Sequence, residues 1–127
     1  MRDVPIGTRA EVERVVEFKH TLSSFNEALP PVFSTPHMIG LMEHACFEAQ
    51  EPFCDPGEIT VGTAIHVEHR APATIGSVVK AEAIMEKRDG RFFIYRVRAW
   101  NDKGDLGFGT VHRAVVDLAK FRDKFQQ

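Results

Sequence analysis

The chain has 127 residues, of which 43% are hydrophobic and 27% are charged, and its 16 basic and 18 acidic residues leave a formal charge of −2. This composition excludes a disordered chain, a collagen-like repeat and a coiled coil. The charge balance offers no basic surface to a phosphate backbone, and no run of 18 apolar residues occurs, so we expect neither nucleic acid nor a membrane as a partner. Because no internal repeat or linker is visible, residues 1–127 are expected to form a single domain.

The two cysteines indicate a reducing compartment. Cys46 and Cys54 are eight residues apart and form no CxxC motif. Small secreted domains usually contain several disulfides, and this domain already has a hydrophobic core. We therefore expect both cysteines to be reduced thiols and the protein to be cytoplasmic.

The first part of the chain is predicted to be a strand followed by a loop. Residues 7–18 are rich in valine with interleaved Arg and Glu, which favours a strand. Residues 20–32 lose all periodicity and contain Pro30 and Pro31, which is typical of a loop that crosses a surface or covers a cleft.

The only long helix is predicted at residues 36–50. Thr35 is a preferred N-cap residue, and Pro36 fits the first helical position because its missing N–H would have no partner there. The apolar residues recur at spacings of three and four and therefore share one face: Met38, Leu41, Met42, Ala45 and Ala49. The helix is expected to end near Pro52.

Strands dominate the remainder of the chain. Four strands and a short final helix are predicted at residues 58–69, 77–86, 91–100, 106–117 and 118–125. Asp89-Gly90 and residues 102–105 are expected to form hairpin turns. This order is α+β and favours the hotdog fold, in which an antiparallel sheet wraps around one long central helix. Strand 58–69 is expected to lie at an open edge and to pair with its copy, which gives a homodimer or a tetramer.

Three separated motifs carry a family resemblance. They are VFSTPHMIGLME at residues 32–43, GE at 57–58 with VGTAIHVEH at 61–69, and GTVHRAVV at 109–116 followed by Lys120-Phe121. In this order and at these spacings, the chain resembles the fluoroacetyl-CoA-thioesterase-like branch of the hotdog thioesterases over residues 32–121.

The resemblance implies an enzyme that hydrolyses a small acyl-CoA to the free acid and CoA. The implied catalytic residues are Thr35, Glu43 and His69. The residues expected to bind substrate are Gly62, Phe33 and Arg113. No cofactor is expected, because CoA is part of the substrate. The alternatives are a hotdog enoyl-CoA hydratase and a catalytically silent module that binds acyl-CoA.

The residues themselves allow a plainer interpretation of each candidate. Glu43 is a carboxylate in an apolar helix, which fits either a solvated flank or a partly desolvated general base. Capping alone explains Thr35, although the positive end of a helix also suits a thioester carbonyl that gathers negative charge. Arg113 is either a solvated side chain or a cation near the CoA phosphates.

The histidines predict no metal site. His66 and His69 are three residues apart on a strand, so their side chains face opposite sides of the sheet and cannot bind one metal ion. The other four are expected to be structural or surface residues: His20, His37, His44 and His112.

The spacing of Thr35 and Glu43 suggests a site shared between subunits. Eight helical residues separate them by roughly 12 Å along the axis, which puts a direct contact within one chain out of reach. We therefore expect the helix start of one chain to face Glu43 of its dimer partner.

Overall fold

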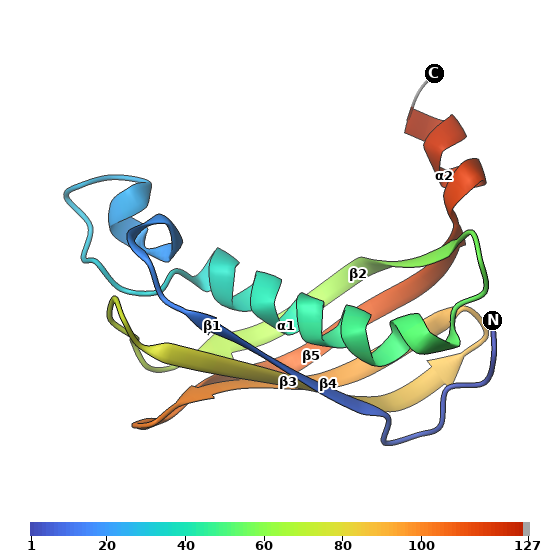
Figure 1. Cartoon of the computed structure of the whole chain (residues 1–127), viewed down its shortest axis with the longest axis horizontal. Coiled ribbons are helices and arrows are strands. Elements are labelled where there is room, and N and C mark those ends of the chain that lie inside the picture. Colours follow the sequence, from blue (N-terminus) through green and yellow to red (C-terminus); the bar gives the residue numbers. More distant parts are fainter. Residues whose placement is uncertain (126–127) are drawn as a thin grey trace.

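A long helix lies along one face of a five-stranded antiparallel sheet in the computed structural model, which describes residues 1–125 (Figure 1). The elements are β1 (Arg9–Val15), α1 (Thr35–Gln50), β2 (Glu58–His69), β3 (Val78–Asp89), β4 (Phe92–Asn101), β5 (Gly104–Asp117) and α2 (Leu118–Phe125). The strand order across the sheet is β1-β3-β4-β5-β2. The predicted α+β class is confirmed, and so is the wrapping of the sheet around α1 that defines the hotdog fold.

The predicted bounds hold best where turn residues or pairing fix them. β2 and α2 have the predicted limits, and β3, β4 and β5 differ from their predicted ranges by no more than three residues at either end. The turn between β3 and β4 falls at Gly90, whose φ of 61° suits glycine. The first strand is shorter than the predicted range 7–18. It ends at Val15 because its pairing partner, Val78, is the first residue of β3.

The start of α1 corrects the predicted cap. The N-cap residue is Ser34 and not Thr35, because Ser34 has extended backbone angles and its Oγ accepts the N–H of His37 at 3.3 Å. A backbone bond from Ser34 to His20 holds this residue outside the helix. Serine and threonine both suit an N-cap, so residue type does not decide between neighbouring positions. Thr35 is therefore the first helical residue, and its hydroxyl is not used for capping.

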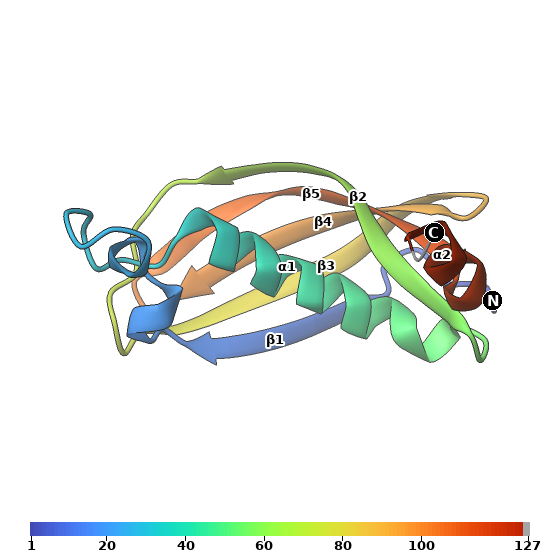
Figure 2. The ribbon, with the colours of Figure 1, turned by 90° about the horizontal axis from the view of Figure 1, so that it is seen from above.

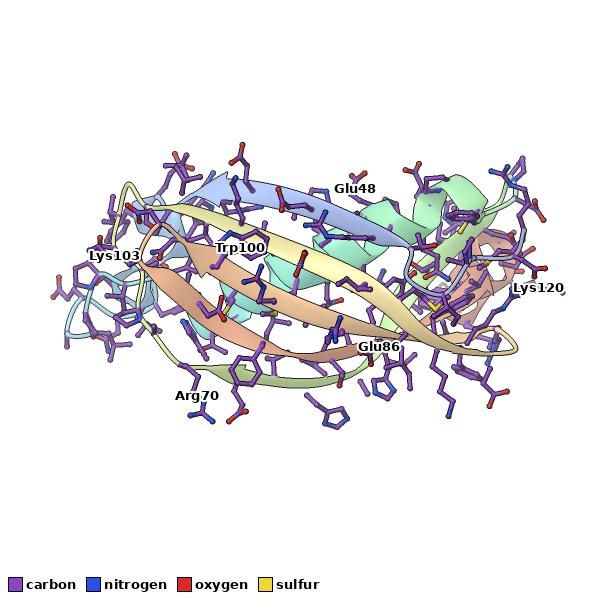
Figure 3. The ribbon with its side chains drawn as sticks, turned by 90° about the horizontal axis from the view of Figure 1, so that it is seen from below. Glu48, Arg70, Glu86, Trp100, Lys103 and Lys120 are labelled. Carbon is purple, nitrogen blue, oxygen red and sulfur yellow. The ribbon has the colours of Figure 1, made fainter. Side chains whose placement is uncertain are left out.

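The core lies between α1 and the inner face of the sheet. Alternate residues of β3 and β4 point inward and are fully or almost fully buried, namely Val79, Ala81, Ala83, Met85, Phe93, Tyr95, Val97 and Ala99. The three alanines on these strands leave room for the helix to approach the sheet. The opposite face of the sheet carries Trp100, whose ring lies 4.2 Å from the guanidinium of Arg98 (Figure 3).

β1 and β2 form the two edges of the sheet, on either side of α1 when it is seen from above (Figure 2). β1 has seven residues and β2 has twelve, so β2 is the long edge that was predicted. A bulge between Gly62 and Ala64 interrupts the pairing of β2 with β5. Among the described residues, no helix is long and apolar enough to cross a membrane.

Candidate active site

Thr35 and His69 meet at the start of α1. Thr35 lies in the first turn of the helix and His69 is the last residue of β2, yet Thr35 Oγ1 lies 2.8 Å from His69 Nδ1. Burial lowers the pKa of His69, and the backbone of Ala71 partly offsets this effect. A lowered pKa keeps the imidazole neutral near pH 7, so Nδ1 can exchange a hydrogen bond with the hydroxyl in either direction.

A surface hollow of about 270 Å³ opens beside this pair. Its walls come from the loop before α1 and from the end of β2, and they include Leu22, Val32, Phe33, Thr35, His69 and Pro72. Phe33, which was predicted to bind substrate, is only 1% exposed and forms part of the apolar wall. The hollow thus places one hydroxyl and one imidazole against an apolar surface, which is typical of a small-molecule site.

Glu43 and Arg113 form a second pair near the middle of α1. Arg113 Nη1 donates a hydrogen bond of 3.0 Å to Glu43 Oε2. Arg113 Nη2 donates to the carbonyl oxygen of Thr60 at 2.8 Å and to its Oγ1 at 2.9 Å. The side chain of Glu43 is 35% exposed, whereas that of Arg113 is 6% exposed. One carboxylate oxygen is therefore held from inside the protein, and the side chain still reaches solvent.

Gly62 lies directly under the Glu43 carboxylate. A Cβ at position 62 would come within 2.8 Å of Glu43 Oε2 and within 3.7 Å of Arg113 Nη1. Such a contact is too close, so an added Cβ would displace the end of the Glu43 side chain. Gly62, which was predicted to line the site, therefore leaves room for the Glu43 carboxylate.

The four polar residues remain two separate pairs within one chain. Among the described residues, no hydrogen bond connects Thr35 or His69 with Glu43 or Arg113. Glu43 follows Thr35 by eight positions on the helix, which corresponds to roughly 12 Å of rise. A single chain therefore presents a hydroxyl–imidazole pair and a carboxylate at two places along the same side of α1 and β2.

The position of Arg113 and the role of Thr60 were not found from the sequence. Arg113 was expected to be either a solvated side chain or a cation near the CoA phosphates. It is not solvated, because its guanidinium points into the protein and donates three hydrogen bonds there. The alternation Val111, Arg113, Val115 places all three side chains on the inner face of β5, and this pattern could have revealed a buried arginine.

The other histidines do not join either pair. His66 and His112 lie on the outer face of the sheet with ring centroids 5.4 Å apart, whereas His69 lies on the face that carries α1. The predicted separation of His66 and His69 is therefore confirmed. Within residues 1–125, no group of three or more His, Cys, Asp or Glu side chains could hold a metal ion.

The chain is similar to known thioesterases. The family model described as fluoroacetyl-CoA-specific thioesterase matches residues 16–119. The fluoroacetyl-CoA thioesterase of Streptantibioticus cattleyicolor is 43% identical over 98 residues, which cover 77% of this chain and 70% of that protein.

Two solved structures show the same architecture. A structure of the fluoroacetyl-CoA thioesterase is 36% identical and superposes with a TM-score of 0.93, covering 98% of this chain and 97% of that one. A thioesterase superfamily member from Thermus thermophilus is 32% identical, with a TM-score of 0.92 over 99% of this chain and 93% of that one.

Proposed function

Because the chain belongs to the fluoroacetyl-CoA-specific thioesterase family and is an acyl-CoA thioester hydrolase, we propose that it hydrolyses a small acyl-CoA with Thr35, Glu43 and His69. The observation that carries this proposal is the 2.8 Å contact between Thr35 Oγ1 and His69 Nδ1 beside an apolar hollow. The products are the free acid and CoA, and CoA enters only as part of the substrate.

Thr35 and His69 stabilise the negative charge that develops on the thioester oxygen. His69 Nδ1–H donates to Thr35 Oγ1, which leaves the hydroxyl hydrogen of Thr35 to be donated to the substrate oxygen. Ser34 already accepts the N–H of His37, so the cap is complete without Thr35. The positive end of α1 adds to the stabilisation, because Thr35 lies in its first turn.

Glu43 acts as the general base. Its Oε2 is held by Arg113, and its partly exposed carboxylate takes a proton from the attacking water. The water oxygen then bonds to the thioester carbon, the C–S bond breaks, and the CoA sulfur leaves as the thiolate. A single turnover in ¹⁸O water tests this step. Direct attack puts ¹⁸O into the acid product. If Glu43 itself attacked and water then opened the resulting anhydride at the Glu43 carbonyl carbon, the first acid released would instead carry a ¹⁶O atom of Glu43, and the ¹⁸O would stay on the protein.

The complete site forms between two subunits. β2 is hydrogen-bonded to β5 on one side and is a sheet edge on the other. If β2 pairs antiparallel with its copy about a two-fold axis at His66, His69 lies opposite residue 63 of the partner subunit, next to Gly62 of the partner subunit. That pairing sets the Thr35–His69 pair of one chain beside the carboxylate of the other, which a single chain keeps apart.

Disulfide trapping tests the dimer. In a Cys54→Ser background, His66→Cys places two thiols on the axis, at a distance that a disulfide can bridge. Oxidation is expected to give a covalent dimer, whereas the matched variant Glu48→Cys, on the exposed face of α1, stays unlinked. An active protein that sediments as a monomer at micromolar concentration and forms no cross-link would contradict the proposed dimer.

The substrate class is tested with a panel of acyl-CoAs and detection of the free thiol. We expect short acyl chains to be hydrolysed, with fluoroacetyl-CoA favoured over acetyl-CoA by less than about 10⁴-fold in kcat/KM, the scale that needs more than a simple pocket contact. The reason is that the segment over the hollow, residues 20–32, contains no Phe, Tyr or Trp other than Phe25, and the ring of Phe25 stacks on His37 instead. A ratio above 10⁴, or no hydrolysis of any acyl-CoA, would contradict the proposal.

The proposal includes a cytoplasmic location. Cys46 and Cys54 are both free thiols, and Cys46 is buried, which raises its pKa to about 12 and leaves it unreactive. Unpaired cysteines are typical of a reducing compartment.

A further inference from the structure

His20 is a buried histidine close to the start of α1. It is the last residue of a short 3₁₀ helix, Phe18–His20, and only 3% of it is exposed. It also begins the segment over the hollow, residues 20–32, which supplies Leu22 and Val32 to the wall of the hollow. A polar ring is costly to bury unless it has partners, so the contacts of His20 account for its position.

Two contacts of His20 lie on either side of Thr35 in the chain. The carbonyl oxygen of His20 accepts the backbone N–H of Ser34 at 2.9 Å, one residue before Thr35. The ring of His20 meets the ring of His37 edge-on, with centroids 5.3 Å apart, two residues after Thr35. The same buried residue therefore fixes the helix start before and after Thr35, whose Oγ1 lies 2.8 Å from His69 Nδ1.

We propose that His20 is a positioning residue that aims the Thr35 hydroxyl at the thioester oxygen by fixing the first turn of α1. This inference rests on the proposed role of Thr35. Because His20 acts through Ser34 and His37, its effect is expected in kcat and not in substrate affinity. The alternative is that His20 serves only the stability of the fold.

The ring of His20 is itself fixed by two hydrogen-bond donors. Nδ1 lies 2.9 Å from the backbone nitrogen of Glu17, and Nε2 lies 2.9 Å from Arg14 Nη1. Burial is the main cause that lowers the pKa of His20, and Arg14 lowers it further, so the ring is neutral near pH 7. A neutral ring can accept a hydrogen bond at one nitrogen, whereas a protonated ring accepts at neither. The surroundings of His20 thus suit a neutral imidazole that links β1 to the start of α1.

A second ring of the same segment packs on His37. Phe25 stacks on His37 with centroids 6.1 Å apart and 26° between the ring planes. His37 therefore contacts two rings of the segment over the hollow, His20 and Phe25. A displacement of about 1 Å in a positioned group can cost on the order of 10²-fold in rate. Loss of the His20 ring should therefore move the Thr35 hydroxyl and lower turnover.

A double-mutant cycle separates positioning from stability. His20→Ala is expected to lower kcat by about 10- to 10²-fold with KM within about threefold. In a Thr35→Ala background the same substitution should lower kcat by less than about threefold, because no hydroxyl is left to position. His20→Asn, whose Oδ1 can still accept the N–H of Glu17, should recover part of kcat. The matched control His44→Ala removes an exposed histidine of α1 and leaves kcat unchanged.

The outcomes separate this inference from the proposed function. If folded His20→Ala keeps its kcat, or loses as much in the Thr35→Ala background as in wild type, the inference is wrong, while the hydrolase stands. If His20→Ala does not fold, His37→Ala decides by the same cycle, since it removes only the partly exposed partner ring. Equal kcat losses in the two backgrounds, or no loss, would then overturn the inference. If the wild-type protein hydrolyses no acyl-CoA, the proposed function itself fails.

Discussion

The two halves of α1 hold their polar residues in opposite ways. At the N-terminal end, Thr35 is exposed and shares a hydrogen bond with a half-buried histidine beside an open hollow. Near the middle, Glu43 is bound to a buried arginine that is itself fixed to β2. Thr35 and His69 at the first half can donate hydrogen bonds to a substrate, whereas Arg113 fixes the carboxylate of Glu43 at the second half. In the proposed mechanism, binding and base catalysis are divided between these two places, and a second subunit is expected to bring them together.

Among these predictions, substitution of Glu43 in the second half of α1 is expected to have the largest effect on turnover. Glu43→Gln keeps the shape of the side chain and removes its basicity, so kcat should fall by at least about 10²-fold, the usual scale for the loss of a general base. Steady-state kinetics on the best acyl-CoA measures the change, with circular dichroism as the control for folding. Unchanged turnover in a folded Glu43→Gln protein would remove Glu43 from the mechanism.

At the start of α1, substitution of Thr35 is expected to change activity, and substitution of its neighbour Ser34 is expected to change stability. Thr35→Ala removes a donor to the substrate oxygen and should lower kcat by about 10²-fold, while Thr35→Ser should stay near wild type. Ser34→Ala removes the cap and should lower the free energy of unfolding by about 1 kcal/mol. Kinetics and urea unfolding of the three variants check this. A large loss of stability in Thr35→Ala would show that Thr35 caps the helix after all.

The stability of the protein should depend on pH through His20 and His69. Burial is the main cause that lowers the pKa of His20 and of His69 below the usual 6.5. Between the folded-state pKa values of these histidines and the usual pKa of 6.5, the unfolded chain therefore binds more protons than the folded protein. The stability that they contribute is fully present above about pH 6.5 and is lost as the pH falls towards their folded-state pKa values. Urea unfolding at pH 7.5 and pH 5 should show a shallower pH dependence in His69→Gln than in wild type. An identical dependence would contradict the assigned burial effect.

The smallest expected effect is that of Tyr95→Phe, in the core, on the free energy of unfolding. Tyr95 is fully buried, and its hydroxyl has no hydrogen-bond partner among the described residues. Removing an unpaired buried hydroxyl costs nothing, so Tyr95→Phe should leave the free energy of unfolding unchanged or raise it by up to about 1 kcal/mol. The control Phe93→Ala, on the same face of β4, should lower it by about 3–5 kcal/mol. A loss of more than about 1 kcal/mol in Tyr95→Phe would reveal a partner for the hydroxyl.

Local patterns predicted the fold better than they predicted the contacts. The limits of β2 and the turn at Gly90 follow from alternation and turn chemistry, which act over a few residues. The choice of Ser34 over Thr35 as N-cap depends on a backbone bond to His20, which the residue types do not encode. Local rules are therefore sufficient for the elements, and they fail where a distant residue fixes the backbone.

The site shows the same limit. Glu43 was identified as unusual in an apolar helix, but its partner Arg113 lies 70 residues away and could be found only from the valine alternation on β5. The bulge between Gly62 and Ala64 shifts the register of β2 by one residue, and nothing in the local sequence predicts it. Pairings of this kind depend on how the sheet curves under the helix.

The most direct test of the shared site is a mixture of two inactive proteins, Thr35→Ala and Glu43→Gln. Random reassortment of equal amounts makes half of the dimers mixed, and each mixed dimer has one intact site, so activity should return to about a quarter of the wild-type value per chain. Native mass spectrometry of differently tagged subunits establishes that exchange has occurred. Exchange without any gain over the separate variants would mean that each site lies within one chain, which would contradict the division of labour between the two halves of α1.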